Sequence, residues 1–320
     1  MKHRNLFLTL LLSSFILLTV LDAPTAARRR TRDISDQQRI RAAKKDKVEF
    51  EMRYDFSMQA VPSKMNFVTL IPQTIADRQK ILDINYSTQP RRVFTKSANT
   101  YAEFVFNGPP TQFTLKINVK AEIYRYDLLT ARKQYKKQPP PKDPNLSDFI
   151  RHEHYIQKNH ARIHEIAETV RGQTEIDIAK SLYDFVTDRL RYVPRTDELG
   201  AVKALAAKQG DCVEYSDLFV ALCRAKNIPA RVIKGYVTEF DDSPEHAWAE
   251  VYLTELGWVP FDLTYGDVKQ KSTKNKRFQK LKPIYIYLTS TRNDPILDEA
   301  VVVRGLWVGE VTLRDSIVFK

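Results

Sequence analysis

Three stretches decide the fold: QGDCVEY at residues 209–215, EHAW at residues 245–248 and GWVPFD at residues 257–262. Each brings one reactive side chain to a point where a helix or strand is expected to begin or end. The three side chains are a cysteine, a histidine and an aspartate, in that order along the chain. Such a set can form a nucleophilic thiolate, its base and a carboxylate that orients the base. The stretches therefore predict acyl-transfer chemistry through a thiol.

The cysteine of this set, Cys212, is expected at the start of a helix. Asp211 fits the N-cap, and Glu214 fits the capping-box position three residues later. Free N–H groups and the helix dipole favour a thiolate at a helix start and offer a backbone donor to an oxyanion. A second cysteine, Cys223, lies about 16 Å further along the same expected helix, whereas a disulfide needs Cα atoms ~6 Å apart. We expect Cys223 to be buried and Cys212 to be a free, reactive thiol rather than a structural cysteine.

The histidine of the set, His246, is expected on a strand over residues 245–253, where it shares a face with Trp248. The following strand ends at Asp262. An antiparallel pairing would bring this carboxylate to Nδ1 of His246, where it would orient the base. No histidine lies between His164 and His246 or after His246, so this half of the chain offers no rival base. The alternatives are a structural histidine and an aspartate that only forms a turn.

An oxyanion in such a site needs a second donor besides the N–H of Cys212. Gln209, three residues upstream, and Tyr192 are the candidates, and each could instead be a helix-end or core residue. Trp248, on the same strand face as His246, completes the set of supporting residues.

The histidines earlier in the chain are weak candidates for a metal site. His160 and His164 are four residues apart and could share a helix face, but no glutamate completes a His-Glu-x-x-His pattern. A solvated helix face is the simpler interpretation, and we expect neither a metal nor another cofactor.

Residues 48–130 are predicted to form an all-β sandwich domain. Apolar and polar side chains alternate from Val48 to Ala60, which is the period of a half-buried strand. Further strands are expected at residues 66–71, 80–87, 101–106 and 111–126. The Lys-, Gln- and Pro-rich residues 131–147 are expected to form a linker at the domain boundary.

Residues 148–320 are predicted to form the catalytic domain. Helical patterns are expected at residues 147–170, 174–190 and 199–208. Strands at residues 281–290 and 300–319 are expected to close the sheet of this domain. Within the first of them, residues 284–287 are interpreted as sheet packing rather than as a substrate platform.

The first 27 residues have the pattern of an export signal, because positive charges precede an apolar run at residues 6–21 and small residues follow it. As a helix the run would span roughly 24 Å, less than the ~30 Å hydrocarbon core of a bilayer. We expect residues 1–27 to be cleaved and the protein to be exported, to a periplasmic or extracellular location. An uncleaved membrane anchor at residues 6–21 is the alternative.

The next segment, residues 28–47, is basic and is expected to be flexible. It could contact anionic material of the cell envelope, and the net charge of +12 suits such a polyanionic neighbour. No zinc-finger spacing or Gly-rich RNA-binding signature is found in the sequence, which argues against a nucleic-acid partner.

The region from residue 175 to residue 265 resembles bacterial transglutaminase-like domains. The resemblance rests on the order and spacing of Gly-Asp-Cys-x-Glu-Tyr at 210–215, Asn-Ile-Pro-Ala-Arg-Val at 227–232, His-Ala-Trp at 246–248 and Trp-Val-Pro-Phe-Asp-Leu-Thr at 258–264. It implies an α+β, papain-like core in which a helix bundle packs on an antiparallel sheet. In that core Cys212 would be the nucleophile, His246 the base and Asp262 the orienting carboxylate. The strands ahead of it resemble the β domain often found before such cores.

These observations predict an exported, thiol-dependent acyl-transfer enzyme that acts on peptide or glutamine carboxamide bonds through a thioacyl intermediate on Cys212. Hydrolysis, as in a protease or amidase, is favoured over the cross-linking of glutamine to lysine amines by a transglutaminase. A third alternative is a catalytically idle module that binds peptides or envelope material. The expected partner is a protein or peptide substrate.

Overall fold

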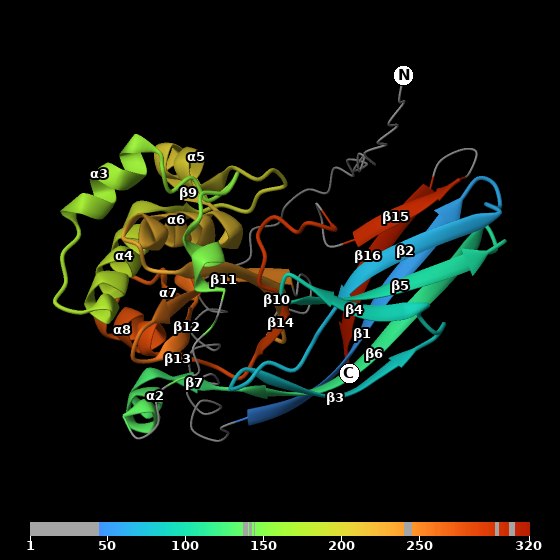
Figure 1. The fold of residues 1–320 in the computed structure, drawn as a ribbon, viewed down its shortest axis with the longest axis horizontal. Helices are drawn as coiled ribbons and strands as arrows, with labels where there is room; N and C mark the ends of the chain where they lie inside the picture. Colours follow the sequence, from blue (N-terminus) through green and yellow to red (C-terminus); the bar gives the residue numbers. More distant parts are fainter. Residues whose placement is uncertain are drawn as a thin grey trace, which may run out of the picture.

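The computed structural model describes most of the chain. The described residues are 45–136, 140, 143, 145–239, 245–297, 301–306 and 311–320. The expected signal at residues 1–27, its alternative as an anchor at residues 6–21 and most of the basic segment lie outside them. Among the described helices, none combines the length and apolarity needed to cross a membrane. Figure 1 shows a helical region with its own sheet lying beside a region built of strands.

The region of strands is a sandwich of two four-stranded antiparallel sheets, in the orders β16-β1-β6-β3 and β15-β2-β5-β4. Its strands are β1 (Lys45–Met58), β2 (Lys64–Ile71), β3 (Gln79–Tyr86), β4 (Arg92–Lys96), β5 (Asn99–Asn107), β6 (Gln112–Tyr124), β15 (Val301–Leu306) and β16 (Val311–Phe319). On β1 every second side chain is buried from Phe50 to Met58, which is the predicted alternation. These side chains pack with those of β2, β5 and β6 in one apolar core.

Two strands from the end of the chain complete this sandwich. β16 pairs with β1 along its whole length, and β15 pairs with β2. The prediction that residues 300–319 close the catalytic sheet is therefore wrong. The segment predicted as the catalytic domain, residues 148–320, contributes to both regions. Apolar alternation suits any half-buried antiparallel sheet, so the pattern could not identify which sheet these strands join.

Two boundaries in the first half of the chain differ from the predicted ones. β1 begins at Lys45, inside the basic segment that was expected to be flexible up to residue 47. The helix α2 (Leu128–Tyr135) occupies the start of the predicted linker, residues 131–147. The composition of both segments is polar, which favoured a flexible chain, but part of each segment forms regular secondary structure.

The predicted helix over residues 147–170 is replaced by two shorter elements. The 3₁₀ helix η1 (Leu146–Ile150) comes first, and α3 (Ala161–Thr169) begins only after His160, its N-cap. Nδ1 of His160 accepts the backbone N–H two residues later at 3.2 Å. His160 therefore does not share the body of a helix with His164. Within the described part of the chain, no group of His, Cys, Asp and Glu is arranged to bind a metal.

The helical region contains a four-stranded antiparallel sheet in the order β12-β11-β10-β14, and α6 packs against β10 and β11 at its centre. The sheet strands are β10 (Ala230–Val237), β11 (Glu245–Leu253), β12 (Gly257–Phe261) and β14 (Tyr285–Thr289). The helices are α4 (Glu175–Arg189), α5 (Gly200–Ala207), α6 (Cys212–Ala225), α7 (Leu263–Gly266) and α8 (Lys271–Gln279). Two short pairs join β8 (Arg191–Tyr192) with β9 (Gln209–Gly210) and β7 (Tyr126–Asp127) with β13 (Lys280–Leu281).

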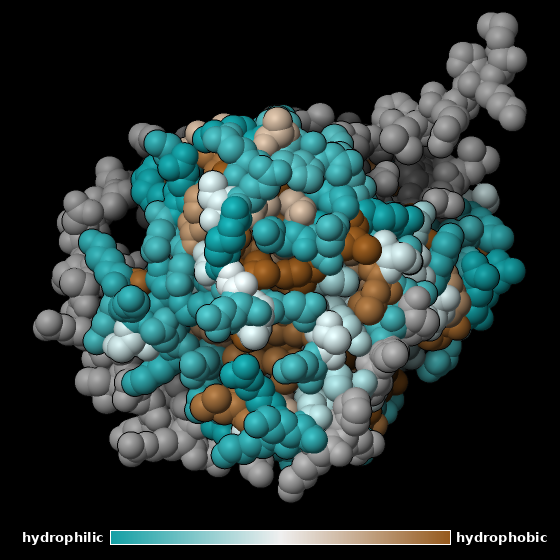
Figure 2. Space-filling model, turned by 60° about the vertical axis from the view of Figure 1, so that its left-hand side comes forward, coloured by the Kyte–Doolittle hydropathy of each residue, from teal (hydrophilic) through white to brown (hydrophobic). Residues whose placement is uncertain are grey.

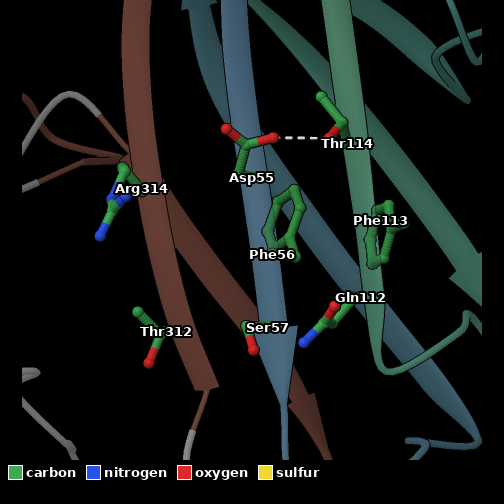
Figure 3. A pocket seen from close by; sticks show the side chains of 8 residues that line it. All are labelled: Asp55, Phe56, Ser57, Gln112, Phe113, Thr114, Thr312 and Arg314. Carbon is green, nitrogen blue, oxygen red and sulfur yellow. Dashed lines mark hydrogen bonds between the residues drawn. The ribbon is translucent and has the colours of Figure 1, made fainter.

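The two regions present different surfaces. Figure 2, turned to bring the helical region forward, shows hydrophilic residues over most of the face, with apolar residues between them near the middle. On the sandwich, a hollow of about 500 Å³ lies across β1, β6 and β16. Figure 3 shows the side chains that line it, among them Asp55, Thr114 and Arg314. Asp55 there already accepts a hydrogen bond from Oγ1 of Thr114 at 2.5 Å. None of the predicted site residues lines this hollow.

Deletion of residues 311–320 is expected to destabilise the sandwich, because β1 would lose the strand that pairs along one of its edges. The free energy of unfolding should fall by about 3 kcal/mol or more, as expected when a packed strand is removed. Hydrogen exchange checks the location: β1 should lose protection while α6 retains it. Loss of protection in β14 with β1 unchanged would contradict the observed pairing.

Candidate active site

The start of α6 has the predicted capping box. Oδ1 of Asp211 accepts the N–H of Val213 at 2.9 Å, and Oε2 of Glu214 accepts the N–H of Asp211 at 3.0 Å. The residue immediately before Asp211 must be glycine, because a Cβ atom on Gly210 would lie 2.3 Å from Cβ of Glu214. Cys212 is thereby fixed as the first residue of the helix, where backbone N–H groups lack intrahelical acceptors and favour an anion.

Glu214 connects this helix start to the preceding helix. Its side chain is buried, and its Oε1 accepts the N–H of Leu199, the N-cap of α5, at 3.0 Å. Burial raises the pKa of Glu214 to about 7, although the two backbone donors oppose the shift. The carboxyl group that caps the nucleophile's helix is therefore also part of the packing between α5 and α6.

His246 and Asp262 are brought together by the antiparallel pairing of β11 with β12. His246 is the second residue of β11, and Asp262 follows β12 as the N-cap of α7. Nε2 of His246 lies 2.7 Å from Oδ2 of Asp262, with both side chains buried. The expectation that Nδ1 would face the carboxylate is wrong. Sequence spacing places a ring beside a carboxylate, but only packing decides which edge of the ring faces it.

The Cys212 side chain completes the set, because it lies close enough to the His246 ring to contribute to the raised pKa of that ring. Since Nε2 faces Asp262, the remaining nitrogen, Nδ1, is the one available to the sulfur. The structure therefore brings the three predicted residues into one row, with the carboxylate hydrogen-bonded to the imidazole and the sulfur near the imidazole. The sulfur lies at the start of a helix and the other two groups at the ends of neighbouring strands.

The charges of this row reinforce one another. Burial by itself would lower the pKa of His246, but the charge and hydrogen bond of Asp262, together with Cys212, raise it to about 10. Burial would raise the pKa of Asp262, but His246, the N–H of Tyr265 and the hydroxyl of Tyr285 hold it below its usual range. At neutral pH the row therefore contains a carboxylate and an imidazolium beside the sulfur, the arrangement that activates a thiol as a nucleophile.

Asp262 receives donors that the sequence analysis missed. The hydroxyl of Tyr285 donates to Oδ2 at 2.7 Å, while the N–H of Tyr265 and Oγ1 of Thr264 donate to Oδ1 at 3.0 and 2.9 Å. The hydroxyl of Tyr183 donates to the backbone carbonyl of Asp262 at 3.0 Å. Tyr285 lies in the stretch interpreted as sheet packing. The alternation of Tyr285 with Tyr287 in the sequence could have indicated two hydroxyls on one strand face, but it did not identify Asp262 as the acceptor.

Trp248 packs against the ring of His246. It is fully buried, and its ring stacks on that of His246 with centroids 6.1 Å apart and planes inclined by 25°. Tyr285 and Tyr287 enclose it edge-on at 5.0 and 4.8 Å. Trp248 thus packs against the ring of the predicted base, and a role toward a substrate oxyanion stays a prediction.

Tyr192 and Gln209 both lie beside the start of α6, on the parallel pair of β8 and β9. Tyr192 is 49% exposed; partial burial raises its pKa, and the neighbouring Cys212 and two carboxylates add to the shift. Gln209 is half-buried, and its Oε1 accepts a hydrogen bond from Nη2 of Arg191 at 3.1 Å. Tyr192 thus lies near Cys212, and the role of both residues as oxyanion donors stays a prediction.

Comparisons with known proteins identify the region that carries this geometry. Residues 164–263 match the family described as the transglutaminase-like superfamily. Protein-glutamine gamma-glutamyltransferase from Pseudomonas aeruginosa is 35% identical over 71 residues, which are 18% of this chain and 10% of that protein. Uncharacterized protein YebA from Bacillus subtilis is 35% identical over 89 residues, which are 23% of this chain and 12% of that protein. The similarity thus spans only about a tenth of the length of these curated relatives.

A solved structure extends the likeness beyond this region. A candidate cysteine protease from Cytophaga hutchinsonii aligns with 86% of this chain and 91% of its own, with a TM-score of 0.56 and 17% sequence identity. At that identity the likeness concerns the fold. It confirms the predicted α+β core with a preceding all-β region.

Iodoacetamide at pH 6–7 is expected to label Cys212 at least about tenfold faster than Cys223. Cys223 is fully buried, and burial raises its pKa far above the ordinary range, whereas Cys212 is partly exposed. His246→Ala should slow the labelling of Cys212, because the imidazolium is lost. Mass spectrometry of the peptides measures both rates. Equal rates at the two thiols would argue for a catalytically idle protein.

Tyr285→Phe is expected to shift the acid limb of the Cys212 labelling profile to higher pH, by up to about one unit. The reason is that the pKa of Asp262 is held down partly by the hydroxyl of Tyr285, so the carboxylate would protonate earlier as the pH falls. Tyr287→Phe is the matched control, since its hydroxyl contacts Glu250 at 3.3 Å instead. Identical profiles for the two variants would show that Tyr285 does not act through Asp262.

Proposed function

We propose that this protein is an acyl-transfer enzyme whose nucleophile is Cys212. The premise is that residues 164–263 match the transglutaminase-like superfamily. The observation that carries the proposal is the row of the partly exposed Cys212 and the buried His246 and Asp262, in which the histidine pKa is raised to about 10. A structural histidine has no need of a carboxylate on one side and a thiol on the other. The substrate class that suits this row is a peptide or glutamine carboxamide carbonyl.

In the first half of the reaction the sulfur attacks the carbonyl carbon, and a C–S bond forms as the carbonyl oxygen becomes an oxyanion. The N–H of Cys212, at the first position of α6, would be one donor to this oxyanion, because it has no acceptor within the helix. The C–N bond then breaks, and the imidazolium of His246 gives its Nδ1 proton to the departing amine. Asp262 stays ionised throughout and keeps the ring oriented through Nε2.

In the second half an acceptor attacks the thioester, His246 takes the acceptor's proton, and the C–S bond breaks. Water as acceptor gives hydrolysis, the outcome of an amidase or protease. A lysine amine as acceptor gives a cross-link, the outcome of a transglutaminase. We favour hydrolysis, which agrees with the name of the fold neighbour, a candidate cysteine protease. Cross-linking is the second candidate, and the gamma-glutamyltransferase relative supports it.

The proposal includes export of the protein, on the basis of residues 1–27, which lie outside the described part of the chain. A periplasmic or extracellular location is consistent with the chain's net charge of +12, which would favour contact with anionic envelope material. The proposed substrate is therefore a protein or peptide of that compartment.

Incubation with a defined peptide mixture, with and without a lysine-like amine, is expected to yield cleaved or deamidated peptides. Mass spectrometry distinguishes cleavage, deamidation and amine incorporation by their mass changes. Cys212→Ser is the control, because it preserves the shape of the nucleophile but removes its thiolate, and it should yield none of the products. Dominant amine incorporation would favour the transglutaminase. The absence of products despite a fast-labelling Cys212 would contradict turnover of the peptides tested.

A further inference from the structure

Two consecutive residues of the sandwich, Arg78 and Gln79, point into the catalytic region. They lie where β3 begins, and both are buried, with 7% and 0% of their surface exposed. Polar side chains of this size are rarely buried unless their atoms find partners. Most of their hydrogen bonds reach the catalytic sheet, at Glu250, Trp258 and Tyr287. The others reach the backbone carbonyls of Gln73 and Asp77, in the loop between β2 and β3.

Arg78 joins two strands of that sheet. Its Nε donates to Oε1 of Glu250 on β11 at 2.8 Å, and its Nη2 donates to the backbone carbonyl of Trp258 on β12 at 2.5 Å. Glu250 is buried and also accepts from Arg231 at 2.6 Å, so its negative charge is compensated from both sides. A planar guanidinium that binds a carboxylate and a carbonyl together restricts the positions of both strands.

Gln79 extends the sheet at its open edge. Its Oε1 accepts the N–H of Tyr287 on β14 at 2.7 Å, and its Nε2 donates to the carbonyl of Tyr287 at 2.9 Å. These two bonds satisfy the backbone N–H and carbonyl of Tyr287, as pairing with a neighbouring strand would. The side chain of Gln79 therefore occupies the place of a strand beside β14.

The three contacted strands are those that carry the site. Along β11, His246 lies four residues before Glu250, and Asp262 follows Trp258 by four residues at the end of β12. On β14, Tyr285 is two residues before the residue that Gln79 contacts, and its hydroxyl binds Asp262.

The side chains of β14 alternate between two cores. Tyr285 and Tyr287 belong to the apolar cluster of the catalytic region, whereas Ile286 and Leu288 belong to that of the sandwich. This strand therefore cannot move relative to the sandwich without disturbing the donor to Asp262.

We infer that the sandwich positions the catalytic row, and that Arg78 and Gln79 are its positioning residues, which set the relative places of β11, β12 and β14. The inference rests on the proposed function. An interface that served only to attach the sandwich could be apolar, because buried ion pairs contribute little net stability over apolar packing. Directional bonds to three strands instead define their relative positions, as a row of reacting groups requires.

Gln79→Met tests the inference, because methionine has a similar shape but makes neither hydrogen bond. The titration of His246, followed by NMR and assigned with His246→Gln, should move from about 10 toward its ordinary value of about 6.5, since the ring loses part of its contact with Asp262. Labelling of Cys212 by iodoacetamide at pH 7 should slow by about tenfold. Arg78→Lys, which keeps the charge but not the two-acceptor geometry, should shift both measurements in the same direction.

Tyr54→Phe is the matched control, because it removes one buried hydrogen bond, at 2.7 Å to Oγ1 of Thr69, wholly within the sandwich. Circular dichroism and thermal unfolding establish that each variant is folded. If folded Gln79→Met and Arg78→Lys keep the His246 titration and labelling rate of Tyr54→Phe, the inference is overturned. Both measurements are made without a substrate, so failure of turnover would contradict the proposed function and leave this result unaffected.

Discussion

The hydrogen bond between Nε2 of His246 and Oδ2 of Asp262 is the interaction on which the rest of the site depends. Both side chains are almost fully buried, and burying either charge alone would cost several kcal/mol. Each charge is therefore stable there only because the other is present. This requirement explains the additional donors around Asp262, since a buried carboxylate has more lone pairs than one imidazolium can satisfy.

The fold meets this requirement by combining two kinds of element. A helix start presents the sulfur of Cys212, where unpaired N–H groups favour a negative charge. Two antiparallel strands carry the ring and the carboxylate, and the ring packs on Trp248. The helix and the sheet are joined by apolar packing between α6 and the strands β10 and β11. Apolar packing brings the elements together, and polar contacts then determine how the reacting groups are oriented.

The sandwich is more closely connected to this arrangement than a separate domain on a linker would be. Its sheets are completed by β15 and β16 from the end of the chain, so the catalytic region is inserted between strands of the sandwich. β14 contributes to the apolar cores of both regions. The predicted linker at residues 131–147 was inferred from a change in composition. The chain returns from the catalytic region to the sandwich near its end, with β15 and β16.

Several local features could be predicted because the cause lies within a few residues. The capping box of α6 follows from side chains that bond backbone groups two or three residues away, and the alternation of β1 follows from its two faces. The order and spacing of cysteine, histidine and aspartate likewise indicated the row. Helix α3 shows the limit even of local patterns, because the residues between Asn145 and His160 form only a short 3₁₀ helix and no α-helix.

The sequence by itself therefore determined the type of most elements and the three groups that can react. Only the tertiary structure decided that Nε2 of His246 faces Asp262, that Tyr285 is a donor to that carboxylate, and that β16 pairs with β1. The physical reason is that periodicity and capping depend on neighbours within one turn or one strand. A ring's orientation, a hydroxyl's acceptor and a strand's partner depend instead on residues far apart in the chain that packing brings into contact.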